Sequence, residues 1–203
     1  MSNKSLALFD FDGTITTKDS FIQFIKYYHG SAKLILGIAL HLPILVLFKF
    51  RIIPNWKAKE ALLKYFFKGH NENKFNKKAA EFAINRIPGM LNSETMALLS
   101  KHLSQNDDVY VVSASFENWL SPWFTNHNVQ VIASRLETKD NTLTGNIYGA
   151  NCYGPEKVSR IKEKVDLKLY SKIYAYGDSR GDKEMLEIAD YGIRCTKARN
   201  FLG

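Results

Sequence analysis

Residues 6–14 have the sequence LALFDFDGT, and this stretch decides the fold of the chain. Four apolar residues run directly into Asp10, and Asp12 follows before a glycine and a threonine. A short, continuous apolar run that ends at a turn signal is typical of a buried parallel strand. Residues two apart in an extended chain point to the same side, so both acids are predicted to leave the strand toward one place. Open α/β sheets bind their ligands at this carboxyl end of their strands.

Two carboxylates at this spacing repel each other, and a cation between them or protonation of one relieves the repulsion. A strand followed by an acidic turn is the ordinary structural explanation of an isolated D-x-D pattern. The other strand ends of the chain therefore decide whether Asp10 and Asp12 form a site.

The order of the predicted elements indicates an α/β protein with an insertion. Helical patterns fill about seventy residues after Thr17, and from residue 90 onward strands alternate with helices. The strand patterns lie at 108–113, 129–133, 172–176 and 191–194, with a hairpin at 135–148. This alternation predicts a Rossmann-like parallel sheet with helices on both faces and an all-helical cap after the first strand. We expect a core domain of residues 1–16 and 90–203 and a cap domain of residues 17–89.

Residues 34–48 of the insertion carry no formal charge and include His41 and Pro43. As one helix they would span about 22 Å, which is short of the roughly 30 Å of a bilayer core. We expect a helix pair, bent or broken at Pro43, that forms the cap's own core. An interfacial segment at a membrane surface is the alternative.

The formal charge is +8, and most of it lies between Lys49 and Arg86, where ten basic residues face three acids. This segment is a solvated helical face or attracts an anionic substrate or an anionic membrane surface. No nucleic-acid-binding motif accompanies it, so we expect no nucleic-acid partner. The two cysteines show no metal or disulfide pattern, and the start of the chain is too short for a signal-peptide core. We therefore expect a cytoplasmic protein, with membrane association left open.

Three later segments carry polar groups that could join Asp10 and Asp12 in one site. An apolar strand ends at Ser113 and Ala114, where a hydroxyl and backbone N–H groups can hold an anion. Lys157 begins a predicted helix. Another strand ends at Asp178, and Asp182 follows four residues later, which is a plausible magnesium site because Mg²⁺ takes oxygen ligands.

Together and in this order, these segments resemble the four motifs of the haloacid dehalogenase-like (HAD) superfamily of aspartate-nucleophile phosphatases. The resemblance covers residues 5–16 and 90–195, and the helical insertion is similar to that of the small-cap, phosphoserine phosphatase-like branch (subfamily IB). It implies an Mg²⁺-dependent phosphatase that acts on a small phosphorylated substrate through an aspartyl phosphate.

The resemblance also assigns roles at the first motif. Asp10 would be the nucleophile, and Asp12 would protonate the leaving alcohol and then deprotonate the attacking water. Thr14 would fix the turn that aims Asp12. Mg²⁺ would bind Asp10, Asp178 and, through its backbone carbonyl, Asp12, while Asp182 would be a further, water-mediated ligand or would orient the others.

The remaining motifs would hold the phosphoryl group. Ser113, the backbone at Ala114, Lys157 and Thr14 would contact its oxygens, and Lys157 would also balance charge.

The cap normally supplies substrate selectivity in this superfamily. Asp19 stands where the phosphoserine branch carries a cap acid, although it can equally be a helix N-cap. Leu63 replaces the expected cap arginine, and Gly181 replaces an asparagine before the last acid. Both departures from the pattern of that branch argue against phosphoserine as the substrate.

Residues 34–48, the basic segment after them and the turn at Gly69 and His70 resemble the phosphatidylglycerophosphatase C type. That resemblance implies a lipid phosphatase at a membrane surface as an alternative. A phosphotransferase and a catalytically inactive binding protein on the same fold are further alternatives.

Overall fold

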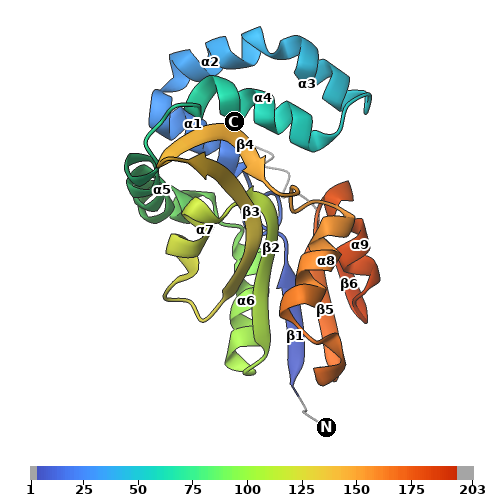
Figure 1. Cartoon of the computed structure of the whole chain (residues 1–203). Coiled ribbons are helices and arrows are strands. Elements are labelled where there is room, and N and C mark those ends of the chain that lie inside the picture. Colours follow the sequence, from blue (N-terminus) through green and yellow to red (C-terminus); the bar gives the residue numbers. More distant parts are fainter. Residues whose placement is uncertain (1–3, 196–203) are drawn as a thin grey trace, which may run out of the picture.

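The centre of the molecule is a six-stranded sheet with the strand order β4-β3-β2-β1-β5-β6, seen in Figure 1. The structure is a computed structural model, and it describes residues 4–195. All neighbouring strands in the sheet run parallel except β3 and β4, which pair antiparallel. The strands are β1 (Ser5–Phe9), β2 (Asp108–Phe116), β3 (Gln130–Lys139), β4 (Thr142–Tyr148), β5 (Lys172–Gly177) and β6 (Tyr191–Arg194). The predicted parallel sheet is confirmed.

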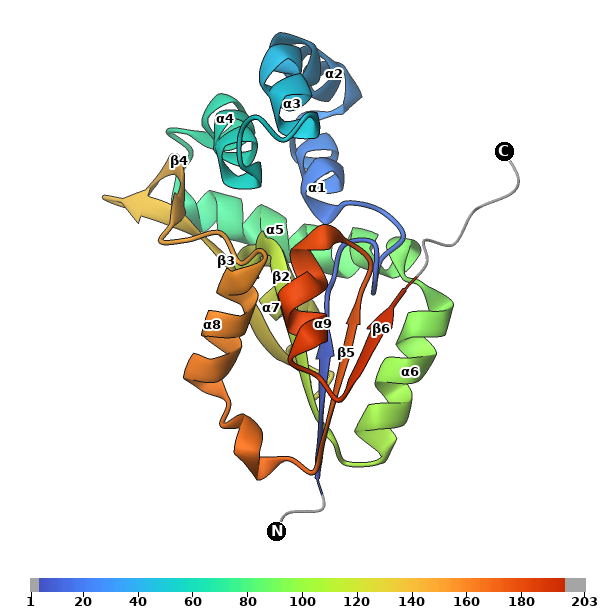
Figure 2. The same cartoon turned by 90° about the vertical axis from the view of Figure 1, so that its right-hand side faces the viewer.

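Helices cover both faces of the sheet because residues of β1 alternate between the two sides. Phe9 shares an apolar cluster with Leu99 of α6 and Trp119 of α7, whereas Leu8 clusters with Ile161 of α8. Figure 2 shows α8 and α6 on opposite sides of the strands. These helices and the short helical turns near them are α6 (Ser93–Ser104), α7 (Glu117–Phe124), α8 (Pro155–Lys164), η2 (Leu167–Leu169), η3 (Arg180–Asp182) and α9 (Lys183–Glu187).

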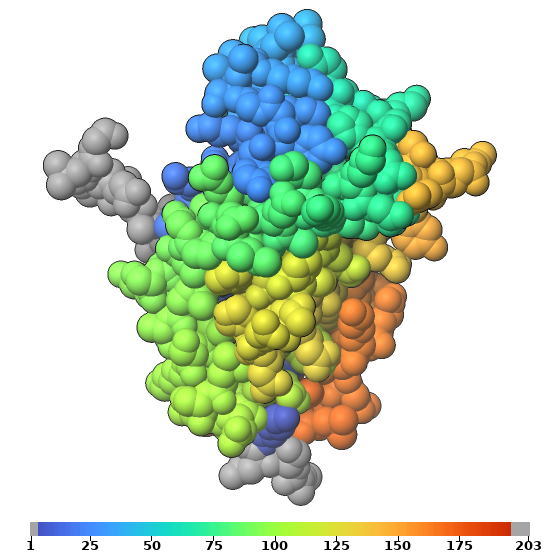
Figure 3. Space-filling model, turned by 90° about the vertical axis from the view of Figure 1, so that its left-hand side faces the viewer, coloured from blue at the N-terminus to red at the C-terminus, as the bar shows by residue number. Residues whose placement is uncertain are grey.

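Five helices follow β1 and form a layer over the carboxyl ends of the strands, as Figures 1 and 3 show. We call them the cap helices: α1 (Ser20–His29), α2 (Ser31–Leu40), α3 (Leu42–Lys49), α4 (Asn55–Phe67) and α5 (Glu72–Arg86), followed by the turn η1 (Ile87–Met90). Helix α5 also packs on α7, and α4 packs on β4. The division into domains at residues 16 and 89 stays a prediction, and residues 1–3 and 196–203 of the expected core lie outside the described residues.

An aromatic cluster joins the cap helices to the core. The ring of Phe24 on α1 lies 5.6 Å from Phe67 of α4, 5.2 Å from Phe75 of α5 and 4.8 Å from Trp119 of α7. All four side chains are buried. Burial of such large rings stabilises the packing of α1, α4 and α5 over the sheet.

The expectation that residues 34–48 form the cap's own core is wrong. Only Leu34 and Gly37 of α2 are buried, and α3 has no buried residue. The chain breaks at His41 into α2 and α3, which meet at 67°, and Pro43 lies in the first turn of α3. A run without charges has no polar face, so the sequence does not show which side packs. In the structure, α2 contacts α4 at Gly37, which lies against the ring of Phe66.

The length of the apolar helices α2 and α3 bears on the membrane alternative. Among the helices of residues 4–195, none alone is long and apolar enough to cross a bilayer. Helices α2 and α3 are long and apolar enough only when taken together, as a pair bent by 67°.

Two strands are longer than predicted. Strand β2 continues past Ser113 to Phe116, with an irregular register between these two residues. Ser113 and Ala114 therefore lie in a strand and not in a turn before a helix. Strand β3 joins the predicted strand at 129–133 to the first arm of the hairpin.

Candidate active site

The central strands bring four predicted residues to one edge of the sheet. Asp10 follows β1, and Asp178 follows the neighbouring strand β5. Asp182 ends the turn η3, and Lys157 is the third residue of α8. Residues up to 172 positions apart thus meet, because parallel strands end at the same edge.

Lys157 is the centre of the polar network. Its side chain is 1% exposed, and its Nζ donates to Asp10 Oδ1, Asp182 Oδ1 and the carbonyl oxygen of Val112, each at 2.6 Å. All three N–H donors of the ammonium are therefore used. Burial lowers the pKa of Lys157, but the charges of Asp10 and Asp182 outweigh it and hold the pKa above its usual value. Lys157 is a permanent cation at this site.

Asp10 is buried beside this cation. Burial raises the pKa of Asp10 to about 7, against the opposing charge of Lys157, and the charge of Asp182 raises it further. The hydroxyl of Thr14 donates to Asp10 Oδ2 at 3.3 Å. Thr14 therefore contacts Asp10 directly, whereas the sequence assigned it to the turn that aims Asp12.

Asp12 has a separate set of partners. The backbone N–H of Ser20 donates to Asp12 Oδ1 at 2.7 Å, and the hydroxyl of Ser115 donates to Asp12 Oδ2 at 2.5 Å. Burial raises the pKa of Asp12 to about 6, and the charge of Asp19 adds to the shift. A carboxyl group fixed by two donors and titrating near neutrality is suited to acid–base work.

Three carboxylates form a candidate metal site. One oxygen each from Asp10, Asp178 and Asp182 lies within 4.8 Å of the others. Gly13, with φ of 89°, lets the carboxylate of Asp178 lie directly against the turn, where a Cβ atom would clash with it. A set of three carboxylate groups that offers only oxygen donors suits a hard divalent cation such as Mg²⁺.

Asp182 is held in place by hydrogen bonds from Ser179 and Lys157. Asp182 Oδ2 accepts hydrogen bonds from the N–H and the hydroxyl of Ser179, at 2.9 and 2.7 Å, and its Oδ1 accepts from Lys157. Both Asp182 oxygens are thus engaged, which suits contact with a metal through water. The side chain of Asp12 is not part of this group, and coordination of a metal by the Asp12 backbone carbonyl stays a prediction.

The predicted phosphate-binding residues of β2 form hydrogen bonds within the protein. The N–H of Ser115 donates to the hydroxyl of Ser113 at 3.0 Å, and Ser113 is 1% exposed. The carbonyl oxygen of Ala114 accepts a hydrogen bond from Lys59 at 2.6 Å. The contact of Ser113 and Ala114 with phosphate stays a prediction.

Asp19 serves as the N-cap of α1. Its Oδ1 accepts a hydrogen bond from the N–H of Ile22 at 3.0 Å. It is exposed, yet its charge acts on Asp12, so it lies beside the site. A role of Asp19 in substrate selectivity stays a prediction.

Two serines at the site were missed by the sequence reasoning. The hydroxyls of Ser20 and Ser115 lie 2.7 Å apart, and Trp119 Nε1 donates to Ser20 at 3.1 Å. Ser115 follows Ser113 by two positions, the same spacing that singled out Asp10 and Asp12. This spacing could have indicated that Ser115 lies at the site, whereas no sequence pattern indicated Ser20.

Lys59 of α4 is a third missed residue. Besides its bond to Ala114, its ammonium lies 4.9 Å from the ring centroid of Phe116. Lys59 shares one face of α4 with Leu62, Leu63 and Phe66, so a single lysine in an apolar stripe was the signal.

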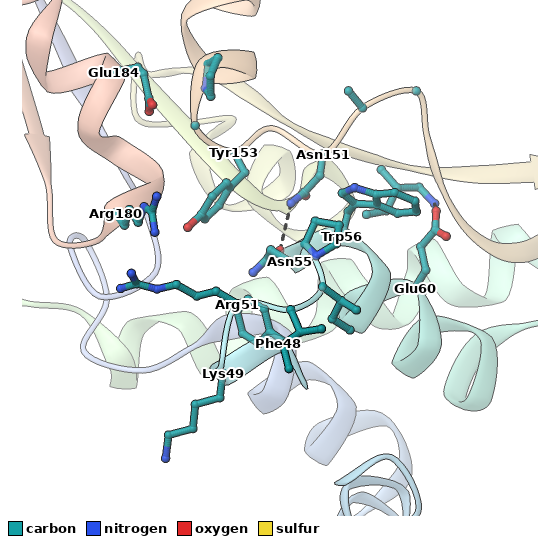
Figure 4. A pocket seen from close by; sticks show the side chains of 18 residues that line it. Phe48, Lys49, Arg51, Asn55, Trp56, Glu60, Asn151, Tyr153, Arg180 and Glu184 are labelled. Atoms are coloured by element: carbon teal, nitrogen blue, oxygen red, sulfur yellow. Dashed lines mark hydrogen bonds between the residues drawn. The ribbon is translucent and has the colours of Figure 1, made fainter. Parts of the chain in front are cut away.

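A cavity of about 950 Å³ lies between the cap and the core, next to this site. The α3–α4 connection and the start of α4 form one wall, and the loop between β4 and α8 forms the other (Figure 4). Arg180, which lies between Asp178 and Asp182 in the chain, also lines it.

A parallel α/β sheet, an acidic cluster held by a buried lysine at its carboxyl edge and a helical layer above it define a class of hydrolases. The family model for haloacid dehalogenase-like hydrolases matches residues 7–187. The chain belongs to this family, and the prediction of a hydrolase is confirmed.

Individual relatives agree with this assignment. The chain is 33% identical to protein CicA of Caulobacter vibrioides over 189 residues, which cover 91% of this chain and 83% of that protein. Its fold is similar to that of a protein of unknown function from Bordetella pertussis Tohama I, with a TM-score of 0.79 and 23% identity over 93% of this chain and 88% of that one. It is also similar to a substrate-bound phosphoserine phosphatase, with a TM-score of 0.63 and 17% identity over 96% and 86% of the two chains. The predicted phosphoserine phosphatase-like fold is confirmed.

Proposed function

We propose that this chain is an Mg²⁺-dependent phosphomonoester phosphatase that acts on a small phosphate ester through an aspartyl phosphate at Asp10. The observation that carries the proposal is the separation of the two first-motif acids into different environments. Asp10 lies against Lys157 and two further carboxylates, while Asp12 is held by Ser20 and Ser115. Two neighbouring carboxyl groups with different surroundings are suited to different roles.

In the first step, a carboxylate oxygen of Asp10 attacks phosphorus and the bond from phosphorus to the ester oxygen breaks. Asp12, in its protonated form, donates its proton to the departing ester oxygen. A pKa of about 6 leaves part of the Asp12 population protonated near neutral pH, which favours this role.

In the second step, water attacks the phosphorus of the aspartyl phosphate. Asp12, now ionised, takes a proton from that water, the bond between phosphorus and Asp10 breaks, and inorganic phosphate leaves. The donors Ser20 and Ser115 hold Asp12 in one orientation for both steps.

The balance of charges around Asp10 also supports the assignment of Asp10 as the nucleophile. Lys157 offsets the charge of Asp10 and Asp182, which otherwise oppose the approach of a phosphate dianion. Asp10 and Asp178 would hold Mg²⁺ directly and Asp182 through water. The ion, when bound, would keep Asp10 ionised and neutralise charge on the phosphoryl oxygens.

The test is release of phosphate from 4-nitrophenyl phosphate and a panel of small phosphate esters, with and without Mg²⁺. We expect turnover that needs Mg²⁺ and falls by about a thousandfold or more in Asp10→Asn. Asp140→Asn, at an exposed hairpin turn, is the matched control and should retain activity. Unchanged turnover in Asp10→Asn would overturn the proposal, and phosphoryl transfer to an added alcohol in place of phosphate release would identify a phosphotransferase.

The exposure of α2 and α3 favours a second candidate, in which the substrate is a lipid phosphate at an anionic membrane surface. Ile35, Leu36, Leu40 and Leu42 are 67%, 55%, 60% and 55% exposed. Lys33 on α2 and Lys49 at the end of α3 flank this apolar surface. Apolar side chains flanked by cations match the interior and the headgroups of an anionic bilayer.

Vesicle flotation tests the second candidate. At low salt we expect flotation with vesicles of phosphatidylcholine and phosphatidylglycerol, none with phosphatidylcholine alone, and loss in Leu36→Glu/Leu40→Glu. Ile84→Glu, at a residue 65% exposed on α5, is the control and should float. No flotation of the unmodified chain would exclude the membrane, and dimers that the double variant abolishes would assign the surface to a second copy.

A further inference from the structure

The cavity between the cap and the core contains two arginines from different parts of the chain. Arg51 comes from the α3–α4 connection, and Arg180 comes from the turn η3 of the core. In Figure 4 the side chain of Arg180 points toward the hydroxyl end of Tyr153, and the side chain of Arg51 extends across the same part of the cavity. Two guanidinium groups that face the same space form a site for an anion, because their planar donors match carboxylate and phosphate oxygens.

Within the described residues, no acid neutralises either arginine. No salt bridge formed within residues 4–195 includes Arg51 or Arg180. Lys157, and not Arg180, pairs with the nearby Asp182. The positive charge of Arg51 and Arg180 therefore remains available to a ligand.

The other charged residues of the cavity leave it with a positive balance. Lys49 adds a third cation, and the lining acids are Glu60 and Glu184. Glu60 is already engaged, since its Oε1 accepts from the N–H of Ile147 at 3.0 Å and its Oε2 lies 3.7 Å from Lys64. Glu184 is thus the one lining acid without an ion pair in the described part of the chain.

The backbone holds Arg51 in a restricted conformation. Its φ of 63° is in the left-handed region, which a residue with a long side chain rarely adopts. The N–H groups of Arg51 and Ile52 donate to Phe48 and Leu47, each at 2.9 Å, and fix this turn. Such strained residues persist where the surrounding structure fixes them, and they are common at ligand sites.

Arg180 connects the cavity to the acidic cluster. It is two residues from Asp178 and two from Asp182, so its Cα lies within about 7 Å of each of theirs. Tyr153 packs against Gly181, and the N–H of Gly154 donates to the carbonyl of Gly181 at 2.9 Å, which makes a continuous wall. This wall leads from the turn η3, which ends at Asp182, to the cavity.

We propose that Arg51 and Arg180 bind a second anionic group on the leaving group of the substrate. This inference rests on the phosphatase function proposed above and narrows its substrate class. The substrates are phosphomonoesters whose alcohol carries a carboxylate or a further phosphate. The connecting part contacts apolar walls formed by Phe48, Ile52 and Trp56.

Calorimetry with non-hydrolysable phosphonates tests the site without turnover. The protein with Mg²⁺ is titrated with phosphonocarboxylates of two to six methylenes and with alkylphosphonates of equal length. We expect at least one phosphonocarboxylate to bind tenfold or more tightly than its alkyl partner. This advantage should fall below threefold in Arg51→Gln and in Arg180→Gln.

Lys68→Gln is the matched control, because it removes an exposed cation of the same basic segment outside the cavity. It should keep the tenfold advantage. Equal binding of both series by the unmodified protein, persistence of the advantage in both arginine variants, or an equal loss in Lys68→Gln would each overturn the proposal. Because binding is measured without catalysis, a chain that lacks phosphatase activity but shows the advantage would refute only the proposed reaction.

Discussion

At the scale of single residues, Lys157 holds the acidic cluster together. It bonds Asp10 and Asp182, which are 6% and 1% exposed and which would otherwise be two buried like charges. The desolvation of such a group is offset only by complete pairing, and here all three donors of the lysine are satisfied.

Lys157→Met should therefore lower the free energy of unfolding by about 3 kcal/mol at neutral pH, because it leaves buried carboxylates without their cation. The loss should shrink as the pH falls, because burial raises the pKa of Asp10, and without the lysine Asp10 takes up a proton still more readily when folded than when unfolded. Urea unfolding at pH 7.5 and pH 5 measures both effects. An equal loss at the two pH values would contradict this account.

Ser115 controls the acid–base group. Its hydrogen bond lowers the pKa of Asp12, against the larger effect of burial. Ser115→Ala should reduce kcat roughly tenfold, because Asp12 loses a hydrogen bond to a charged group. The pKa of Asp12 should rise, so the protonated acid persists to higher pH and the alkaline limb of the kcat profile should move upward in pH. A limb that stays in place or moves downward would show that Asp12 is not the group that titrates.

At the scale of elements, α4 connects the cap to the strand that carries Ser113. Lys59 on α4 donates to the carbonyl of Ala114 and lies over the ring of Phe116. This contact is one polar link, whereas the aromatic cluster around Phe24 supplies the apolar packing.

Lys59→Ala should loosen the cap without unfolding the core. We expect faster hydrogen exchange in α4 and a KM for phosphate esters raised about threefold to tenfold, because loss of a partly buried hydrogen bond to a charged group costs about 1.5 kcal/mol. Lys57→Ala, an exposed position on the same helix, serves as the control. Equal exchange in the two variants would show that Lys59 does not hold the cap.

At the scale of the whole molecule, the sequence predicted the sheet and the main acids because both follow from local patterns. An apolar run before Asp10 and another before Asp178 mark parallel strands, and parallel strands end at one edge. Lys157 could be placed only through the resemblance to a family, since a lysine at the start of a helix has no distinctive local pattern.

The contacts between the cap and the core could not be predicted from the sequence, because no local sequence pattern encodes them. The bond from Ser20 to Asp12 crosses from the cap to the first motif, and the cavity between Arg51 and Arg180 depends on how the cap lies over the core. The exposure of α2 and α3 was predicted incorrectly because residues 34–48 carry no charge that marks a solvent-facing side. The packing partners, and not the composition, decide which face is buried.

The central claim is that Asp10 carries the phosphoryl group, and acid-quenched mass spectrometry of the Asp12→Asn variant tests it most directly. Without its acid–base group, this variant should hydrolyse the intermediate slowly when supplied with Mg²⁺ and 4-nitrophenyl phosphate, a substrate whose leaving group needs little protonation. We predict an added mass of about 80 Da, one phosphoryl group, on the peptide that contains Asp10, and no such mass in Asp10→Asn/Asp12→Asn. Nitrophenol release without a labelled peptide, or a phosphoryl group on another residue, would contradict the account.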